Sequence, residues 1–248
     1  MGTPLDHTAF KYPVALLENT DSPLMRLKQY DGKDGRKVWL GRNEVDLILD
    51  QVSDTEKKIA LHLAARCGLR VKEIVGVTPL DVVEDDVIGP RVRVQQGKGD
   101  KYREVPANRE LYTTADTFAQ VRDEPPDTPL VDRSRRTVNR WVNRAADACF
   151  AETGEDGWRY VGPHDLRRTW GTLLVEDGVE PGMIMEWGGW EDWETFREHY
   201  LGAYSPEMER YQASKVTWLG YNQEESGSPS SQQGVDTGRS RFRMEGSR

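Results

Sequence analysis

Two short stretches of the chain place basic side chains at spacings suited to phosphate chemistry. In GPHDLRRTWG, His164 and Arg167 lie three positions apart at the start of an expected helix, so they share one helix face. In GLRVKE, Arg70 precedes Glu73 by the same interval. Arginine grips two phosphate oxygens with its planar fork and stays charged, and histidine transfers protons near neutral pH. These residue types suit the stabilisation of a phosphoryl-transfer transition state.

A further basic residue, Lys98, lies between two glycines in QQGKGDK. Its ammonium can transfer a proton, which completes a set of two arginines, a lysine and a histidine. A P-loop is excluded, because glycine follows Lys98 where a P-loop has serine or threonine. Each group alone also has an ordinary structural interpretation. Arg70 with Glu73 is commonly an ion pair, Lys98 a solvated turn, and a histidine at a helix start a cap.

The chain around these groups predicts several helices and one hairpin. Helical spacing of apolar residues occurs twice within residues 40–77, again in the basic segment 134–150, and in the segment that His164 opens. Strands near 91–95 and 102–106 flank the Gly-Lys-Gly loop and predict a β-hairpin. We therefore expect a mainly α fold with a small antiparallel β-sheet, in the α+β class.

Composition divides the chain into three parts. Residues 1–38 are polar and mixed with turn signals, so we expect a loosely ordered N-terminal arm. Residues 39–218 are expected to form one folded unit. Residues 219–248 are poor in apolar side chains and rich in glycine, serine and glutamine, which predicts a disordered C-terminal tail.

The chain is acidic overall, with a formal net charge of −8 and a pI near 5.2, and 24 arginines outnumber 10 lysines. A halophilic source would favour such a lysine-poor acidic surface, because salt screens its self-repulsion. The net charge does not exclude nucleic acid as a partner, since a local basic patch can bind phosphate on an acidic protein.

The sequence carries no motif of a membrane protein, a secreted protein or a zinc protein. No segment has the length and apolarity of a membrane span or the pattern of a signal peptide, so we expect no membrane association and a cytoplasmic location. Cys67 and Cys149 stand apart, without a CxxC pair or a histidine at ligand spacing. They predict buried thiols rather than a disulfide or a zinc site, and no metal is expected.

Taken in chain order, these groups resemble the catalytic domain of the tyrosine recombinase (phage integrase) family. The resemblance spans roughly residues 40–205 and rests on CGLRVKEIVGV, GKGDKYREVP and GPHDLRRTWGTLL. It implies that residues 39–218 form a catalytic domain that breaks and rejoins DNA strands, as a site-specific recombinase or integrase. It also implies that neither a metal nor ATP nor any other cofactor is required.

The resemblance implies a role for each residue of the set. Arg70 and Arg167 clamp the scissile DNA phosphate, and Glu73 supports the first of these arginines. Lys98 is the general acid to the leaving 5′ oxygen, and His164 accepts or donates a proton. His164 and Arg167 would then point at the phosphate from a helix N-terminus, whose exposed donors favour negative charge.

The family's next motif, Leu-Gly-His, is replaced here by Trp-Gly-Gly-Trp, so Trp190 occupies the histidine position. An indole N–H donates to a phosphate oxygen but cannot shuttle protons, so an acid–base role at this position is lost. A purely structural Trp190 is the equally open alternative.

The implied nucleophile is a tyrosine that forms a 3′-phosphotyrosyl bond, which a 5′-hydroxyl later reverses. The family spacing of nine residues leads from Trp190 to His199, one residue short of Tyr200. Tyr200 is our predicted nucleophile. Tyr204, four residues on, is the alternative, because one helical turn would place it on the same face. A Tyr200 that merely packs its ring is the third interpretation.

A basic run lies between the second and third motifs. Five arginines and no acidic residue occur within a dozen positions: Arg133, Arg135, Arg136, Arg140 and Arg144. Such a run is often a solvated helix face, but next to a phosphate-handling set we expect it to contact the DNA backbone. The resemblance therefore implies double-stranded DNA as the partner, with a homo-oligomer assembled on it, and we expect a nucleoid-associated location.

One feature departs from the family pattern. Its members commonly carry a separate helical DNA-clamping domain, and fewer than 40 residues precede the resemblance here. Either the arm and a partner subunit substitute for that domain, or the chain is a shortened recombinase. Two other functions stay open: a type IB topoisomerase-like relaxer of supercoils, and a catalytically silent DNA-binding regulatory module.

Overall fold

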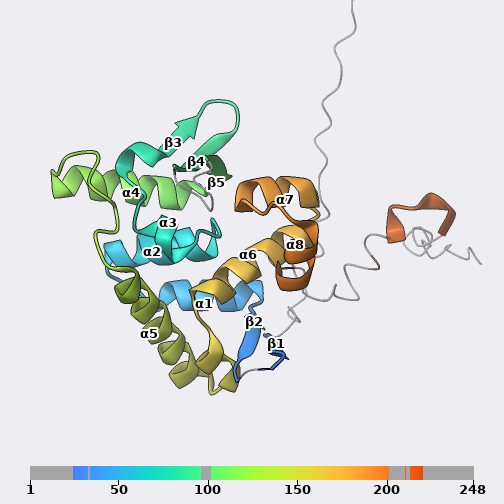
Figure 1. Ribbon diagram of the computed structural model, residues 1–248. Helices are drawn as coiled ribbons and strands as arrows, with labels where there is room; N and C mark the ends of the chain where they lie inside the picture. The colour runs from blue at the N-terminus through green and yellow to red at the C-terminus, as the bar shows by residue number, and fades with distance from the viewer. Residues whose placement is uncertain (1–24, 33, 96–101, 201–209, 211–212, 220–248) are drawn as a thin grey trace, which may run out of the picture. The chain divides into compact units, whose positions relative to one another are not determined.

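The computed structural model describes residues 25–32, 34–95, 102–200, 210 and 213–219, with the backbone alone for residues 198–200 and 217. The chain divides into two compact units, Met1–Ser205 and Pro206–Arg248. The described part of the second unit includes one short 3-10 helix, η4 (Thr217–Leu219). The first unit contains every described residue of the predicted site (Figure 1).

The first unit is mainly helical with two small antiparallel sheets. Its helices are α1 (Arg42–Asp50), α2 (Thr55–Ala65), α3 (Val71–Ile74), α4 (Arg109–Arg122), α5 (Arg135–Thr153), α6 (Pro163–Glu176), α7 (Pro181–Gly188) and α8 (Trp193–Tyr200). Among the described residues of this unit, two 3-10 helices, η2 (Pro79–Asp81) and η3 (Asp156–Tyr160), lie between these elements and the strands. The strands are β1 (Arg26–Gln29), β2 (Arg36–Trp39), β3 (Val82–Asp85), β4 (Gly89–Val94) and β5 (Arg103–Pro106). The predicted fold class is confirmed. Within the described residues, no helix is long and apolar enough to cross a bilayer.

Helix α6, which carries the His-x-x-Arg motif, lies at the centre of the first unit. It contacts β2, α2, α7 and α8, and Figure 1 shows it running between them. Leu166, Trp170 and Leu173 are buried at spacings of four and three residues, as the helical period requires. A helix surrounded on several sides has little freedom to shift, so its N-terminus is firmly placed.

The predicted hairpin is present as the last two strands of a three-stranded sheet with the order β3-β4-β5. Strands β4 and β5 are antiparallel, with Val92 opposite Val105 and Val94 opposite Arg103. Strand β3 was not predicted, because its four residues VVED show no alternation long enough to stand out. The predicted position of Lys98 lies outside the described residues.

The structure differs from the expectation of a loosely ordered arm in residues 26–38. Here β1 and β2 form an antiparallel hairpin. The backbone N–H of Val38 donates to Asp165 Oδ1 (3.0 Å), and that of Leu40 donates to Thr169 Oγ1 (3.0 Å). These tertiary bonds to α6 order a segment whose own sequence carries only turn signals, and both apolar side chains are buried.

Both cysteines are buried free thiols, as the sequence predicts. Burial raises the pKa of Cys67 to about 12. A thiol held protonated in this way is a poor nucleophile and a poor metal ligand, so its contribution is to packing.

Helix α2 buries a histidine, His62, against α4. Its Nε2 lies 3.9 Å from Glu110 Oε1, and its side chain is 5% exposed. Burial lowers the pKa of His62 below its ordinary value of 6.5. The carboxylates of Glu110 and Asp46 act against this shift, whereas Lys58 and Arg66 add to it. The folded chain therefore holds this imidazole neutral where the unfolded chain would protonate it.

This burial predicts an acid-sensitive contribution to stability. Because the unfolded chain binds the extra proton, the contribution of His62 is complete above about pH 6.5 and is lost as the pH falls through 6.5 toward the lowered folded pKa. We expect His62→Gln to flatten the change in Tm between about pH 8 and pH 5.5. Equal slopes in wild type and His62→Gln would contradict the prediction.

Candidate active site

The site is built around the C-terminal end of α7. The helix ends at Gly188, and Gly189 follows in the left-handed region with φ +65°. The last carbonyls of a helix lack intrahelical partners and carry the negative end of its dipole. Here three consecutive carbonyls, those of Trp187, Gly188 and Gly189, each accept a hydrogen bond from a different arginine.

The first of these arginines, Arg167, comes from the first turn of α6 and is 1% exposed. Its Nη2 donates to Gly188 O (2.5 Å), and its Nη1 donates to Gly68 O. Its Cζ lies 4.2 Å from the centre of the Trp190 ring, which places the cation over an aromatic face. Arg167 is thus held in one orientation from three sides.

Glycine is required at both carbonyls that Arg167 contacts. Gly68 has φ +61°, and a Cβ there would overlap the ring of Trp170. A Cβ on Gly188 would overlap the ring of Trp190 in the same way. The two backbone segments that bear these carbonyls can pack directly against the indole rings only because neither residue has a side chain.

The second arginine, Arg70, is the residue that precedes α3, and its side chain is 27% exposed. Its Nη1 donates to Glu73 Oε1 (2.9 Å), and its Nη2 donates to Gly189 O (3.3 Å). The sequence paired Arg70 with Glu73 and left open whether that pair was ordinary. The structure brings Arg70 and Arg167 to adjacent carbonyls, although 97 positions separate them in the chain.

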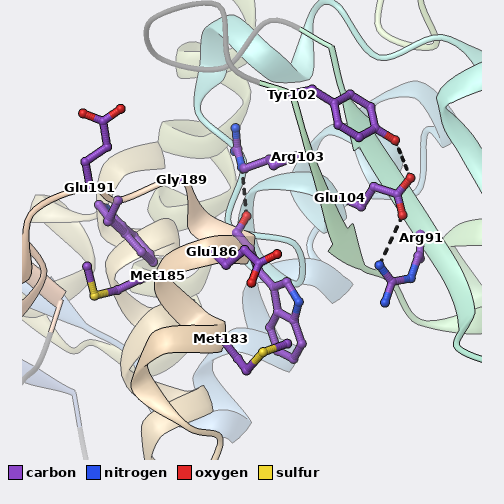
Figure 2. A pocket seen from close by; sticks show the side chains of 11 residues that line it. Arg91, Tyr102, Arg103, Glu104, Met183, Met185, Glu186, Gly189 and Glu191 are labelled. Carbon is purple, nitrogen blue, oxygen red and sulfur yellow. Dashed lines mark hydrogen bonds and ion pairs between the residues drawn. The ribbon is translucent and has the colours of Figure 1, made fainter.

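The third arginine, Arg103, was not predicted. It lies in β5, is 8% exposed, and its Nε donates to Trp187 O (2.8 Å). Its Nη1 and Nη2 donate to Glu73 Oε1 (3.0 Å) and Oε2 (2.8 Å), a bidentate pair. Figure 2 shows Arg103 pointing from β5 toward the turn that ends α7. The alternation of REVP held a usable signal, because Arg103 shares a strand face with the buried Val105.

Glu73 is therefore shared by two arginines. Its side chain is 2% exposed, and besides the three guanidinium contacts its Oε2 accepts from the backbone N–H of Arg70 (2.8 Å). Burial alone would raise the pKa of Glu73, but the hydrogen bonds and charge of Arg103, followed by those of Arg70, bring the pKa below its usual value. The carboxylate is ionised and all four of its acceptor positions are used.

Trp190 is 8% exposed and lies in an aromatic cluster. Its ring centre is 5.9 Å from that of Trp170 and 5.0 Å from that of Phe196. One face of the ring lies against Arg167. The structure thus assigns Trp190 a packing contact with the buried arginine.

His164 is exposed in the first turn of α6, which begins at Pro163 as the sequence predicts. The next residue, Asp165, is buried and accepts from the backbone N–H of Val38 and of Gly162. It also pairs with Arg168. Burial raises the pKa of Asp165, and Arg168 offsets part of that rise. These contacts hold the N-terminus of α6, and with it His164, in place.

The five arginines of the basic run are all exposed on α5 or just before it. Arg133 also pairs with Glu56, with 3.0 Å between Nη2 and Oε2. The opposite side of the helix is buried through Val138, Trp141 and Val142. The run is therefore a solvent-facing surface that a phosphate backbone can reach.

The structure does not describe the side chains of the candidate general acid, Lys98, or of the candidate nucleophiles, Tyr200 and Tyr204. Lys98 lies outside the described residues. Tyr200 ends α8, with its backbone alone described, and Tyr204 lies outside the described part of the chain. Among the described side chains, no group of His, Cys, Asp and Glu is placed to hold a metal ion.

A pocket of about 550 Å³ opens between the β4–β5 hairpin and α7. Arg103 and Trp190 line it beside Met183, Met185 and Glu186. On its hairpin side Glu104 binds Arg91 (3.2 Å) and accepts from the hydroxyl of Tyr102, as Figure 2 shows. Of the three arginines at the end of α7, Arg103 therefore lies at the edge of an open hollow.

Comparison with known proteins gives a family match over most of the chain. The model of the phage integrase family matches residues 38–205. The tyrosine recombinase XerA of Thermococcus kodakarensis is 29% identical over 171 residues, which cover 68% of this chain and 60% of that protein. XerC of Corynebacterium glutamicum is 32% identical over 172 residues, which cover 66% and 54%. The chain thus spans about half to three fifths of the length of these relatives.

Solved structures share the fold. A crystal structure of XerA recombinase matches with a TM-score of 0.57 at 21% identity, covering 71% of this chain and 64% of that one. The XerH site-specific recombinase, in a post-cleavage complex with palindromic difH substrate, matches with a TM-score of 0.58 at 17% identity, covering 76% and 55%. The resemblance inferred from the arginine, lysine-hairpin and His-x-x-Arg motifs is thereby confirmed. With two of those motifs meeting at the end of α7 and the family model spanning them, the chain belongs to the phage integrase family.

Proposed function

We propose that the chain is a site-specific DNA recombinase that cleaves and rejoins strands through a covalent phosphotyrosyl intermediate. The observation that carries the proposal is the meeting of Arg70 and Arg167 at adjacent carbonyls beside Trp190. A structural ion pair would need one arginine and one acid. Here the described cluster holds three arginines and one ionised carboxylate, an excess of positive charge suited to a phosphate.

The proposed reaction is a transesterification. A tyrosine oxygen attacks the scissile phosphorus, the bond from phosphorus to the 5′ oxygen breaks, and the 3′ phosphate becomes joined to the enzyme. The leaving 5′ oxygen takes a proton and departs as a hydroxyl. A 5′-hydroxyl later attacks the phosphotyrosyl bond and releases the tyrosine, so no net bond energy is lost.

The arginines supply charge stabilisation in this scheme. Arg70 and Arg167 neutralise the oxygens of the pentavalent transition state, where negative charge accumulates. Arg167 is buried, and carbonyl contacts fix the positions of both arginines before substrate arrives, so little reorganisation accompanies the reaction. In this scheme His164 accepts the proton that the tyrosine hydroxyl loses on attack and returns it when the 5′-hydroxyl releases the tyrosine. Trp190 packs the face of its ring against Arg167 and offers its indole N–H as a further donor.

The surface outside the cluster is proposed to bind the duplex. The exposed arginines of α5 would contact the backbone phosphates and set the register of the protein on DNA. Recombination joins two sites, so a homo-oligomer assembled on the DNA is part of the proposal. The XerH neighbour, whose structure contains its own DNA substrate, supports DNA as the partner.

Capture of the covalent intermediate tests the proposal. A pool of duplexes with randomised sequence and a nick on one strand releases a short fragment after cleavage, which prevents rejoining. The chain should become linked to DNA in a denaturant-resistant adduct, and sequencing of the attached strands would give the preferred site. Peptide mapping should find the DNA on a tyrosine.

The alternative functions give different outcomes in paired assays. A type IB topoisomerase-like enzyme would relax a supercoiled plasmid without exchanging strands between two sites. A catalytically silent regulatory module would bind duplex without forming any adduct. Exchange between two copies of the recovered site, with adduct formation, is the result that the recombinase proposal requires.

Lys98 has a prediction of its own as the proposed general acid. Lys98→Ala should slow adduct formation on ordinary DNA far more than on DNA with a sulfur in place of the bridging 5′ oxygen, because the thiolate leaves without protonation. Lys72→Ala, at a lysine of α3, is the matched control and should slow neither substrate. Equal slowing of both substrates by Lys98→Ala would remove Lys98 from the role.

A further inference from the structure

Arg103 carries a buried charge that the proposed reaction does not use. Its side chain is 6% exposed, and three of its nitrogens donate to Glu73 and to Trp187 O. Two of these bonds go to a carboxylate, so Glu73 balances the charge of Arg103, whereas the carbonyls that accept from Arg167 are uncharged. Burying a charge is costly unless an opposite charge pairs with it. The role of Arg103 therefore depends on Glu73, the carboxylate with which it pairs.

Glu73 has two tasks that oppose each other. Its carboxylate orients Arg70 through Nη1 and caps the same residue's backbone N–H. The same negative charge also cancels the positive charge of Arg70, which is needed at the phosphate. With Arg103 added, the group of Arg70, Arg103 and Glu73 holds two positive charges and one negative charge, and the surplus is available on Arg70, whose side chain is 27% exposed.

We propose that Arg103 is a positioning residue that neutralises and holds Glu73, so that Arg70 is presented to the scissile phosphate with its positive charge uncancelled. The inference rests on the proposed function, because it assumes that Arg70 meets a DNA phosphate. Geometry supports it. The bidentate contact takes one acceptor position on each Glu73 oxygen and leaves the other two positions to Arg70.

The same side chain joins the two halves of the site. Through Glu73 it reaches the start of α3, and through Trp187 O it reaches the end of α7, where Arg167 and Arg70 also donate. Figure 2 shows Arg103 extending from β5 to the end of α7. Arg103 therefore fixes the carboxylate relative to the carbonyls that position both proposed phosphate clamps.

Charge replacement separates this role from simple packing. Arg103→Met keeps the length and apolar stem but leaves Glu73 to cancel Arg70, and adduct formation should fall by about 10²-fold. Adding Glu73→Gln removes the unbalanced negative charge. The double variant should form the adduct about tenfold faster than Arg103→Met alone. A residue that only stabilised the fold would give a double variant no better than Arg103→Met.

The salt dependence of DNA binding gives a readout that needs no chemistry. With Arg70 cancelled, one fewer phosphate is neutralised, so the slope of log K against log salt should become shallower by about 0.9 in Arg103→Met. The slope should return to the wild-type value in the double variant. Arg103→Lys keeps the charge without the fork, so it should keep the wild-type slope and serve where Arg103→Met fails to fold. Any intact duplex of mixed sequence can be used as the probe.

The pH profile is the third readout. The described charged groups on Glu73 are Arg70 before α3 and Arg103 from β5, so loss of Arg103 removes the larger of the two influences that keep it ionised. The pKa of Glu73 should rise in Arg103→Met, and protonation at lower pH would free Arg70. The activity of the variant relative to wild type should therefore increase as the pH falls.

The outcomes distinguish this inference from the proposed function. A wild-type chain that binds duplex but never forms an adduct overturns the recombinase proposal, and the salt slopes then decide on Arg103. A wild-type chain that forms adducts, with Arg103→Met unchanged in rate and slope, overturns the inference alone. A double variant no better than Arg103→Met in either readout overturns it as well.

Discussion

Arg70→Ala and Arg167→Ala should each reduce adduct formation by about 10²-fold or more, equivalent to roughly 3 kcal/mol of transition-state stabilisation. Each substitution removes charged donors that the proposed mechanism assigns to the phosphate oxygens. The rate should be measured on the nicked duplex at matched salt, because weaker DNA binding alone also lowers it. Arg109→Ala, at an exposed arginine of α4, is the matched control and should stay near the wild-type rate.

The two variants should differ in stability. Truncating Arg167 leaves the carbonyls of Gly68 and Gly188 without its donors and removes the cation from the Trp190 face, so we expect roughly 2 kcal/mol less stability. Truncating Arg70 leaves Glu73 with its bidentate partner Arg103, and the cost should stay below about 1 kcal/mol. Thermal unfolding at neutral pH measures both. Near-normal adduct formation in a folded variant of either arginine would contradict its role as a clamp.

The local parts of the fold were predictable because short-range periodicity determines them. Helix α6 begins where Gly-Pro precedes His164, and α5 buries the stripe that includes Val138 and Trp141. The β4–β5 hairpin follows from alternation on both sides of a glycine-containing loop. In each case the signal lies within a few residues of the element that it predicts.

The parts that were missed depend on contacts between distant segments. The β1–β2 hairpin is ordered by bonds from Val38 and Leu40 to α6, well over a hundred residues away. Arg103 is 30 positions from Glu73 and 84 from Trp187. No local pattern states that a strand arginine will meet a particular carboxylate, so the third arginine of the site emerges only from the fold.

The motif residues were predictable individually, but their arrangement was not. The sequence offered Arg70 and Arg167 as separate arginines and Trp190 as an exception to a motif. Their convergence on Gly188 and Gly189 follows from the way in which α7 ends, where unpaired carbonyls attract donors. The chemistry of a helix end therefore explains why a turn that bears no catalytic group organises the site.

Substitution of the predicted nucleophile, Tyr200, should have the largest effect on adduct formation. Phenylalanine has no oxygen to attack phosphorus, so Tyr200→Phe should abolish the covalent adduct while duplex binding continues. Tyr204→Phe should still form it. Tyr160→Phe, at an exposed tyrosine of η3, is the matched control and should react at the wild-type rate.

The backbone of α8 supports the choice of Tyr200. Phe196 is fully buried, and its ring centre lies 5.0 Å from that of Trp190, so this side of α8 faces the site. Position 200 lies about 40° from Phe196 around the helix axis, whereas position 199 lies about 60° away on the other side. An adduct that survives Tyr200→Phe but not Tyr204→Phe would move the role to Tyr204, and peptide mapping would show the DNA there. An adduct that survives both substitutions would rule out these tyrosines, because each variant lacks the only attacking oxygen that its side chain could supply.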